Sequence, residues 1–278
     1  MLSRRLPPLI GMQDFTELKA KHKVMWGLGE YEEVARNLHS AQDHVIRVAN
    51  IQPGERVLDV ATGTGNTALK ARALGANVTG YDLAPDLLAV ARKKAQGAGH
   101  DDIRFEEGDA AKMPYRDGEF DVVLSTCGHM FAPDHEQVGR ELARVTRSGG
   151  RIVFMAWTPE SGVGGLFKVI GKHAPPPPGV PSPFRWGTEE GVRALLPKVR
   201  DVRFEHGDCV ETQPNAETMA RLYATKYGPT VRAMASLEGA KRDALFADLV
   251  SFFGTYVTPA DGKARWGREY LLTAARKE

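Results

Sequence analysis

The chain has 278 residues, of which 42% are hydrophobic and 26% charged, and its formal net charge is +2. No long Lys/Arg cluster and no run of 18 apolar residues occur, which argues against binding to nucleic acid or a membrane and against a transmembrane helix. The N-terminus lacks the apolar stretch of a signal peptide, and two cysteines, Cys127 and Cys209, cannot by themselves build a disulfide framework or a four-ligand metal site. We therefore expect a cytoplasmic protein with no metal.

The first half of the chain predicts helices followed by an alternation of strands and helices. Residues 12–50 are typical of amphipathic helices. The strands expected after them cover residues 56–61, 77–83, 103–110, 120–126 and 151–157, and the helices between them cover residues 65–75, 85–99 and 135–150. Strands that alternate with helices predict βαβ units and a buried, mostly parallel sheet.

The second half begins with a change of composition. Residues 171–187 are rich in proline, which predicts an ordered surface loop, with a flexible linker as the alternative. The elements expected after it are a helix at 188–196 that Thr188 caps, a strand at 201–211, a helical stretch at 215–257 and a last strand at 268–277. We divide the chain, as one domain with a lid, into a helical cap (1–50), a Rossmann-like core (51–157), a Pro-rich lid segment with a helix (158–200) and a C-terminal part with a helical lid insertion (201–278).

A glycine-containing loop follows the first expected strand, in the stretch VLDVATGTGNTA (residues 57–68). Gly63, Gly65 and Ala68 fit G-x-G-x-x-G/A, the pattern of dinucleotide sites. Ligands of open α/β sheets bind at the carboxyl ends of the strands, and glycines permit a tight turn and a close approach there. Several kinds of site share these glycines, so the loop alone does not identify its ligand.

Acidic residues at three successive strand ends narrow the choice of ligand for this loop. Asp59 lies beside the glycine loop, where a carboxylate would repel the phosphates of a dinucleotide but attract an ammonium or sulfonium group. Asp82 ends the second strand, where an acid accepts hydrogen bonds from ribose hydroxyls, and Asp109 follows the third strand, within reach of an adenine amino group. The alternative is that these acids only cap helices and turns. Together they favour S-adenosylmethionine.

Four segments carry a family resemblance: VLDVATGTGNTA, YDLAPDLLAVARKKA, FEEGDAAKMPYRDGEFDVVLSTCGHMF and ELARVTRSGGRIVFMAW. In this order and spacing they resemble class I S-adenosylmethionine-dependent methyltransferases, especially the small-molecule branch that includes quinone-biosynthesis C-methyltransferases. The resemblance implies an α/β fold: a Rossmann-like, seven-stranded, mostly parallel sheet with helices on both faces and an antiparallel last strand. RSGG replaces the commoner RPGG. STCG replaces the motif of amino-directed DNA methyltransferases, which argues against a nucleic-acid substrate.

The resemblance also implies roles for individual residues. The methionine part of the cofactor would contact Asp59 and the loop Ala61, Thr62, Gly63, Thr64 and Gly65, with Ser125 and Thr126 on the methyl side. The adenosine part would contact Asp82, Leu83, Asp109 and Ala110. Trp26 and Tyr31 would cover the cofactor from an N-terminal helix, and ordinary core packing is the alternative for both.

Methyl transfer needs alignment and exclusion of water, and a base only when the acceptor must lose a proton. His129 follows the fourth strand and is the candidate base, with a purely pocket-shaping role as its alternative. Asp134 is expected to cap a helix, and Cys127 to be a packing residue. The aromatic and histidine side chains that could contact an apolar acceptor, with ordinary core packing as the alternative, are Phe167, His173, Phe184, Trp186, Tyr223 and Tyr227.

The leading hypothesis is transfer of a methyl group from S-adenosylmethionine, with S-adenosylhomocysteine as product, to O, N or C of a small organic acceptor. One alternative is an NAD(P)-dependent oxidoreductase, for which NADH binding and tolerance of Asp59→Asn are expected. Another is a non-catalytic module that binds S-adenosylmethionine. The sequence predicts neither the acceptor nor the oligomeric state.

Overall fold

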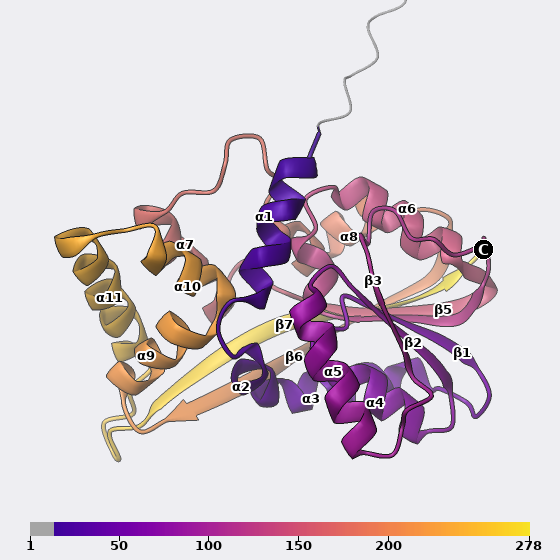
Figure 1. Ribbon diagram of the computed structural model, residues 1–278, viewed down its shortest axis with the longest axis horizontal. Coiled ribbons are helices and arrows are strands. Elements are labelled where there is room, and N and C mark those ends of the chain that lie inside the picture. The colour runs from indigo at the N-terminus through magenta and orange to yellow at the C-terminus, as the bar shows by residue number, and fades with distance from the viewer. Residues whose placement is uncertain (1–13) are drawn as a thin grey trace, which may run out of the picture.

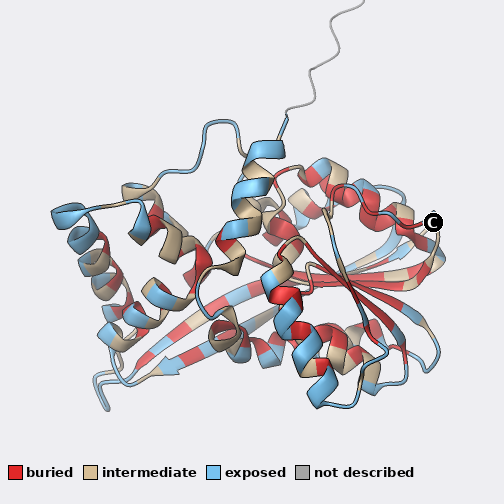
Figure 2. Cartoon of the chain, viewed as in Figure 1, coloured by how far each residue is buried: buried red, intermediate tan, exposed pale blue. Residues whose placement is uncertain are grey.

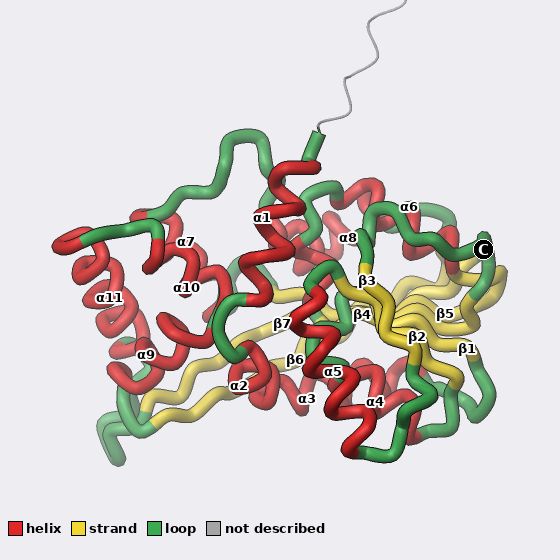
Figure 3. Tube along the Cα trace, viewed as in Figure 1, coloured by secondary structure: helices red, strands yellow, loops and turns green. Residues whose placement is uncertain are grey.

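Seven strands form one sheet in the computed structural model, which describes residues 14–278. They are β1 (Arg56–Val60), β2 (Asn77–Asp82), β3 (Arg104–Glu107), β4 (Phe120–Thr126), β5 (Thr146–Trp157), β6 (Val199–Gln213) and β7 (Ala264–Lys277). Their order in the sheet is β3-β2-β1-β4-β5-β7-β6 (Figure 3). β7 is antiparallel to both of its neighbours, and the other neighbouring pairs are parallel. The predicted fold class is confirmed.

Helices cover both faces of this sheet (Figure 1). The α-helices are α1 (Thr16–Gly27), α2 (Tyr31–Ala35), α3 (His39–Ala49), α4 (Asn66–Ala73), α5 (Pro85–Gly97), α6 (His135–Val145), α7 (Gly162–His173), α8 (Glu189–Leu195), α9 (Ala216–Lys226), α10 (Gly228–Ala235) and α11 (Gly239–Gly254). The short 3-10 helices are η1 (Arg36–Leu38), η2 (Gly128–Phe131) and η3 (Pro183–Gly187). Helices α3, α4 and α5 lie on one face of the sheet and α6 and α8 on the other, while α7, α9, α10 and α11 gather around the far end of the long β6–β7 pair (Figure 1).

The central strands are buried on both faces, as Figure 2 shows. Val57, Leu58 and Val60 of β1 have no exposed surface, and neither do Val122 and Val123 of β4. A parallel sheet that helices cover on both sides removes every side chain of such a strand from water, which explains the continuous apolar runs in the sequence. The polar residues that remain at the strand ends therefore need a separate reason to be there.

Several element boundaries differ from the prediction: β3 ends at Glu107 instead of residue 110, β7 begins at Ala264 instead of residue 268, and two further differences have a clear local reason. The helix expected over residues 135–150 ends at Val145, and residues 146–150 begin β5, where Thr146 pairs with Phe120. Gly149 has a φ of 71°, a conformation that a right-handed helix does not contain. The stretch 215–257 is divided into α9, α10 and α11. The first break falls at Tyr227, and Pro229, which lacks an N–H, lies in the first turn of α10 and not in a helix interior.

Helix α7 was missing from the prediction because its sequence, GVGGLFKVIGKH, contains four glycines. A Cβ at Gly165 would lie 2.7 Å from the Phe252 ring of α11, so this glycine allows the two helices to pack closely. The tertiary contact outweighs the poor helix propensity. The capping roles of Thr188 and Asp134 are confirmed, because they accept hydrogen bonds from the backbone N–H groups of Gly191 and Gln137. Across residues 14–278 no helix combines the length and hydrophobicity needed to cross a bilayer.

Candidate functional site

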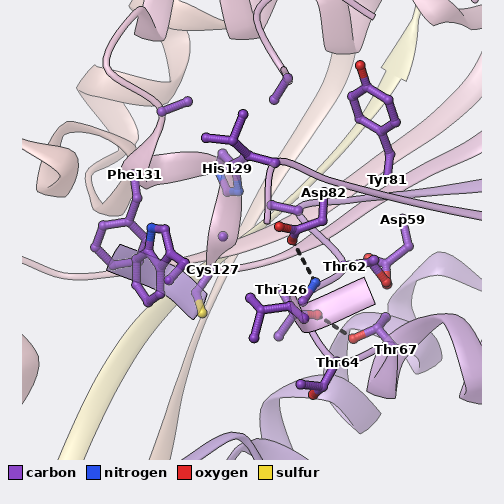
Figure 4. A pocket seen from close by; sticks show the side chains of 18 of the residues that line it. Asp59, Thr62, Thr64, Thr67, Tyr81, Asp82, Thr126, Cys127, His129 and Phe131 are labelled. Atoms are coloured by element: carbon purple, nitrogen blue, oxygen red, sulfur yellow. Dashed lines mark hydrogen bonds between the residues drawn. The ribbon is translucent and has the colours of Figure 1, made fainter. Parts of the chain in front are cut away.

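A cavity of about 1010 Å³, its open mouth included, lies at the carboxyl ends of β1, β2 and β4 (Figure 4). We call it the outer cavity. The predicted site residues that line it are Trp26, Tyr31, Asp59, Ala61, Thr62, Gly63, Thr64, Asp82, Leu83, Asp109, Ala110, Thr126 and His129. Gly65 and Ser125 do not line it. The topology therefore brings together, in one place, residues that are more than 100 positions apart.

Asp59 lies in the outer cavity as a buried carboxylate with one free oxygen. Its Oδ2 accepts a hydrogen bond of 2.6 Å from the Thr62 hydroxyl, and its Oδ1 has no hydrogen-bond partner among the described residues. Burial, together with the nearby charge of Asp82, raises the pKa of Asp59 to about 7, although the Thr62 hydrogen bond opposes the rise. A buried, half-satisfied carboxylate of this kind is suited to a positively charged ligand.

Asp82 fixes the glycine loop. Its Oδ2 accepts a 2.8 Å hydrogen bond from the Gly63 N–H, and its Oδ1 accepts one of 2.8 Å from the Ala84 N–H (Figure 4). Burial raises its pKa, and these backbone hydrogen bonds oppose the rise. The link between the ends of β1 and β2 was not predicted from the sequence.

Asp109 is paired with an N-terminal helix. Lys19 of α1 donates a 2.6 Å hydrogen bond to its Oδ2, while its Oδ1 accepts a bond of 2.9 Å from the Ala111 N–H. A second ion pair, between Lys23 and Glu107, joins the same helix to β3. These pairs hold α1 beside the mouth of the outer cavity, which Lys19 itself lines. No pattern in the sequence relates Asp109 to a partner 90 residues away.

An aromatic cluster lies beside the outer cavity, and three of its members, Trp26, Tyr31 and Phe131, line that cavity. The Trp26 ring lies 5.7 Å from Tyr31, 5.0 Å from Phe131 and 5.9 Å from Tyr227, measured between ring centroids. Phe131 and Cys127 lie on the same side of the pocket in Figure 4. Trp26 and Tyr31 thus belong both to the cavity lining and to a packed cluster, so the two interpretations of these residues are compatible.

Gly65 and Ser125 have structural roles. Gly65 has a φ of 78°, and a Cβ on it would lie 2.9 Å from the Ala91 Cβ and 3.2 Å from the Phe105 ring. The Ser125 hydroxyl donates a 2.7 Å hydrogen bond to the Val60 carbonyl and accepts one from the His129 N–H. The first residue lets α5 and β3 pack against the loop, and the second joins β4 to β1.

His129 lies in an apolar environment. Its Nδ1 is 3.0 Å from the Ser125 hydroxyl, its Nε2 has no partner among the described residues, and its ring packs on Phe154 and Trp186. Burial, with a smaller contribution from the neighbouring His135, lowers the pKa of His129 to about 3. The imidazole is neutral at pH 7 and a weak base, so these contacts favour a pocket-shaping role; catalysis by His129 stays a prediction.

Cys127 is a buried thiol, and only some of the predicted lid residues line a cavity. Burial raises the pKa of the Cys127 thiol to about 12, so it stays protonated and is a poor nucleophile at neutral pH. Tyr223 and Tyr227 line a second, smaller cavity, whereas neither cavity is lined by Phe167, His173, Phe184 or Trp186. Within residues 14–278 no group of three His, Cys, Asp or Glu side chains is placed to hold a metal ion.

The strand order, the antiparallel last strand and the cavity at the ends of β1, β2 and β4 define a Rossmann-like fold of the methyltransferase type. Comparison with known proteins supports this fold. Residues 58–154 match the family model described as "Methyltransferase domain". The YcgJ protein from Bacillus subtilis has a similar structure, with a TM-score of 0.60 at 19% identity over 86% of this chain and 99% of that one.

Sequence relatives identify the family. An uncharacterised protein of Mycobacterium tuberculosis is 37% identical over 262 residues, which cover 92% of this chain and 94% of the relative. A demethylmenaquinone methyltransferase of Thermus thermophilus is 47% identical over 107 residues, 38% of this chain and 48% of the relative. The chain belongs to the class I S-adenosylmethionine-dependent methyltransferases, and along almost its whole length it is related to the mycobacterial protein.

Proposed function

We propose that this protein transfers the methyl group of S-adenosylmethionine to a small organic acceptor, with the cofactor in the outer cavity. The observation that carries the proposal is the free Oδ1 of Asp59, a buried carboxylate oxygen beside the glycine loop. S-adenosylmethionine has an ammonium and a sulfonium group, so its charge fits this oxygen. A dinucleotide would instead place phosphates near two buried acids, Asp59 and Asp82, and the oxidoreductase alternative has no support.

The residues of the chain would bind and orient the reactants. When bound, S-adenosylmethionine supplies a methyl group on a sulfonium, which is a good leaving group. Asp59 and the loop 61–64 would hold the amino-acid part, Asp82 and Leu83 the ribose and adenine, and Asp109 and Ala110 the adenine edge. The aromatic cluster of Trp26, Tyr31, Phe131 and Tyr227 would exclude water from the methyl side.

Isothermal titration calorimetry with S-adenosylhomocysteine and, separately, with NADH tests this function. We expect S-adenosylhomocysteine to bind with one site per chain and NADH not to bind. Absence of S-adenosylhomocysteine binding to the folded protein would overturn the proposal. A screen of phenols, quinols, amines and carboxylic acids with methyl-labelled cofactor then separates an enzyme from a module that binds the cofactor without transferring the methyl group.

The raised pKa of Asp59 predicts that cofactor affinity depends on pH. Because a cationic ligand binds the ionised carboxylate, binding at a pH below about 7 requires release of the Asp59 proton. The ionised share rises from about a tenth at pH 6 to about three quarters at pH 7.5, so we expect affinity for S-adenosylhomocysteine to increase about eightfold over this range. The range ends there because the amino group of the ligand loses its proton at higher pH.

Proton release provides a second readout of the same effect. Calorimetry in buffers of different ionisation enthalpy should show release of about 0.9 proton per ligand at pH 6 and about 0.2 at pH 7.5. Affinity that is constant or falls with rising pH, together with no proton release at pH 6, would contradict the role of Asp59 as the partner of a positive charge.

A further inference from the structure

A second, smaller cavity, of about 340 Å³ with its opening to solvent included, adjoins the outer cavity on the side of the aromatic cluster. We call it the inner cavity. It shares Tyr31, Leu38, Cys127 and Phe131 with the lining of the outer cavity, so the two are separated by the thickness of these side chains. Cys127 directly follows Thr126 at the end of β4, on the side where the methyl group of a bound cofactor is expected. The inner cavity is therefore placed where a methyl acceptor would have to lie.

Half of the residues that line the inner cavity are aromatic. Its six aromatic residues are Tyr31, Phe131, Trp157, Tyr223, Tyr227 and Trp266. Flat side chains on several sides of a small cavity favour a flat, apolar ligand over a branched or strongly hydrated one. Tyr223 and Trp266 belong to the C-terminal part of the chain, so this lining is not a property of the central sheet.

Among the described residues, the single charged side chain in the inner cavity's lining is Arg268 of β7, which is only 1% exposed. Its guanidinium is held by the Cys209 carbonyl at 3.2 Å, the Asn37 carbonyl at 2.9 Å and the Tyr223 hydroxyl at 3.2 Å. Glu211, 3.3 Å from Nη1, balances the charge but does not line the cavity. Of the five N–H bonds of the guanidinium, one on Nη2 has no partner within the part of the chain that the structure describes. The positive end of this ion pair therefore faces the cavity.

Two further hydroxyl groups are available in the same lining. Tyr31 and Tyr227 both line the inner cavity, and neither makes a side-chain hydrogen bond within residues 14–278. Burial raises the pKa of both phenols, and the charge of Arg268 acts in the opposite direction on each of them. Arg268 is thus close enough to stabilise negative charge on a phenol at this place. From residue 14 onward, no carboxylate lines the inner cavity to receive an ammonium group.

We propose that the inner cavity is the acceptor site and that it takes a flat aromatic or conjugated molecule through a phenolic or enolic hydroxyl, in preference to an amine. This inference rests on the proposed methyltransferase function. The Tyr31 and Tyr227 hydroxyls and Arg268 hold the acceptor oxygen, and Arg268 favours its ionised form. The acceptor oxygen forms the new bond to the methyl carbon with a lone pair, the electron pair of the carbon–sulfur bond stays on sulfur, and the hydroxyl proton goes to solvent.

Binding of three probes with the same ring system tests the chemical preference. We would titrate 2-naphthol, 2-naphthylamine and naphthalene into the protein saturated with S-adenosylhomocysteine and follow the fluorescence of the tryptophans, two of which line the cavity. We expect 2-naphthol to bind about tenfold more tightly than either of the others, because only it offers an oxygen to these donors. Equal binding of all three probes, preference for the amine or no binding of 2-naphthol would overturn the inference.

Two variants connect that preference to named residues. Tyr227→Phe removes one hydroxyl and keeps the ring, so we expect it to reduce the preference for 2-naphthol several-fold without changing S-adenosylhomocysteine affinity. Tyr270→Phe is the matched control, because the Tyr270 hydroxyl bonds His44 and lines neither cavity. An unchanged preference in Tyr227→Phe, or an equal loss in the control, would count against the proposed contact.

The charge of Arg268 is tested with 4-nitrophenol, whose ionised form is seen by visible absorbance. We expect its pKa to fall by about one on binding to the wild-type complex and to rise instead in Arg268→Met. Where Arg268→Met does not fold, Arg268→Lys, which keeps the charge but not the fork of donors, should retain the lowered pKa with weaker binding. If S-adenosylhomocysteine itself does not bind, the proposed function fails; if it binds and bound nitrophenol keeps its aqueous pKa, only this inference fails.

Discussion

Replacing Asp59 by asparagine is expected to weaken S-adenosylhomocysteine binding about 100-fold and, at the same time, to stabilise the ligand-free protein. The loss of affinity follows because the ligand's ammonium group would enter a buried site without its counter-charge, which costs about 3 kcal/mol. The asparagine side chain has the size of the original one and its Oδ1 can still accept the hydrogen bond of Thr62. Asp59→Asn therefore removes the negative charge and keeps the size and the Thr62 hydrogen bond of the side chain.

The gain in stability follows from the pKa of Asp59. The folded protein keeps the Asp59 proton up to a pH of about 7, whereas the unfolded chain loses it near the ordinary value of 3.8. The folded state thus binds more protons between these values, and ionised Asp59 lowers the free energy of unfolding increasingly as pH rises from about 4 to 7 and by a constant amount above. An asparagine at this position has no such cost, and we expect a gain on the order of 2 kcal/mol at pH 8, or roughly 5 °C in Tm.

Asp121→Asn is the matched control. Asp121 lies at the opposite end of the sheet, and although partial burial acts against it, hydrogen bonds from Arg56 and Arg147 hold its pKa well below the usual range. Its replacement should lower Tm at pH 8 and leave S-adenosylhomocysteine affinity unchanged. Thermal denaturation at pH 5 and pH 8 measures the change in Tm of each variant, and calorimetry measures its affinity for S-adenosylhomocysteine. If Asp59→Asn binds S-adenosylhomocysteine as tightly as the wild type, Asp59 does not hold the ligand's positive charge. If the Tm of Asp59→Asn at pH 8 is lower than that of the wild type, the charge of buried Asp59 does not destabilise the fold.

The parts of the fold that the sequence predicts are those that local patterns determine. The apolar run at 57–60 and the glycine loop behind it place β1, and the acids at 59, 82 and 109 lie at the ends of successive parallel strands or just beyond them. Topology alone then brings these three acids into one cavity. Helix α7 was missed because its glycines oppose a helix locally and are explained only by the close contact of Gly165 with Phe252.

The contacts that the sequence did not predict join distant segments. Lys19 pairs with Asp109 across 90 residues, and Arg268 contacts the Asn37 carbonyl across 231. No periodicity or spacing relates such positions, because each pair depends on how helices pack over the finished sheet. The same limit explains His129. Its position after the fourth strand is right for a base, but its ring is buried against Phe154 of β5 and against Trp186 of η3, which lies more than 50 residues later.

The two glycines of the loop are expected to respond differently to replacement by alanine. Gly65→Ala puts a side chain at a φ of 78° and a Cβ 2.9 Å from Ala91 and 3.2 Å from Phe105. The backbone conformation costs about 1 kcal/mol and the forced repacking about 2 kcal/mol, so the free energy of unfolding should fall by about 3 kcal/mol. The folded fraction should keep nearly wild-type affinity for S-adenosylhomocysteine, because Gly65 does not line the outer cavity.

Gly63→Ala should weaken ligand binding more than it lowers the free energy of unfolding. Its φ of 56° costs about 1 kcal/mol, but a Cβ there would meet only the Tyr31 ring, at 3.9 Å. Gly63 lines the outer cavity and its N–H bonds to Asp82, so the added methyl group enters the space of the ligand, and we expect about tenfold weaker binding. Urea unfolding and calorimetry measure the two quantities separately. Loss of affinity in Gly65→Ala with unchanged stability would mean that Gly65, against its packing in the structure, approaches the cofactor after all.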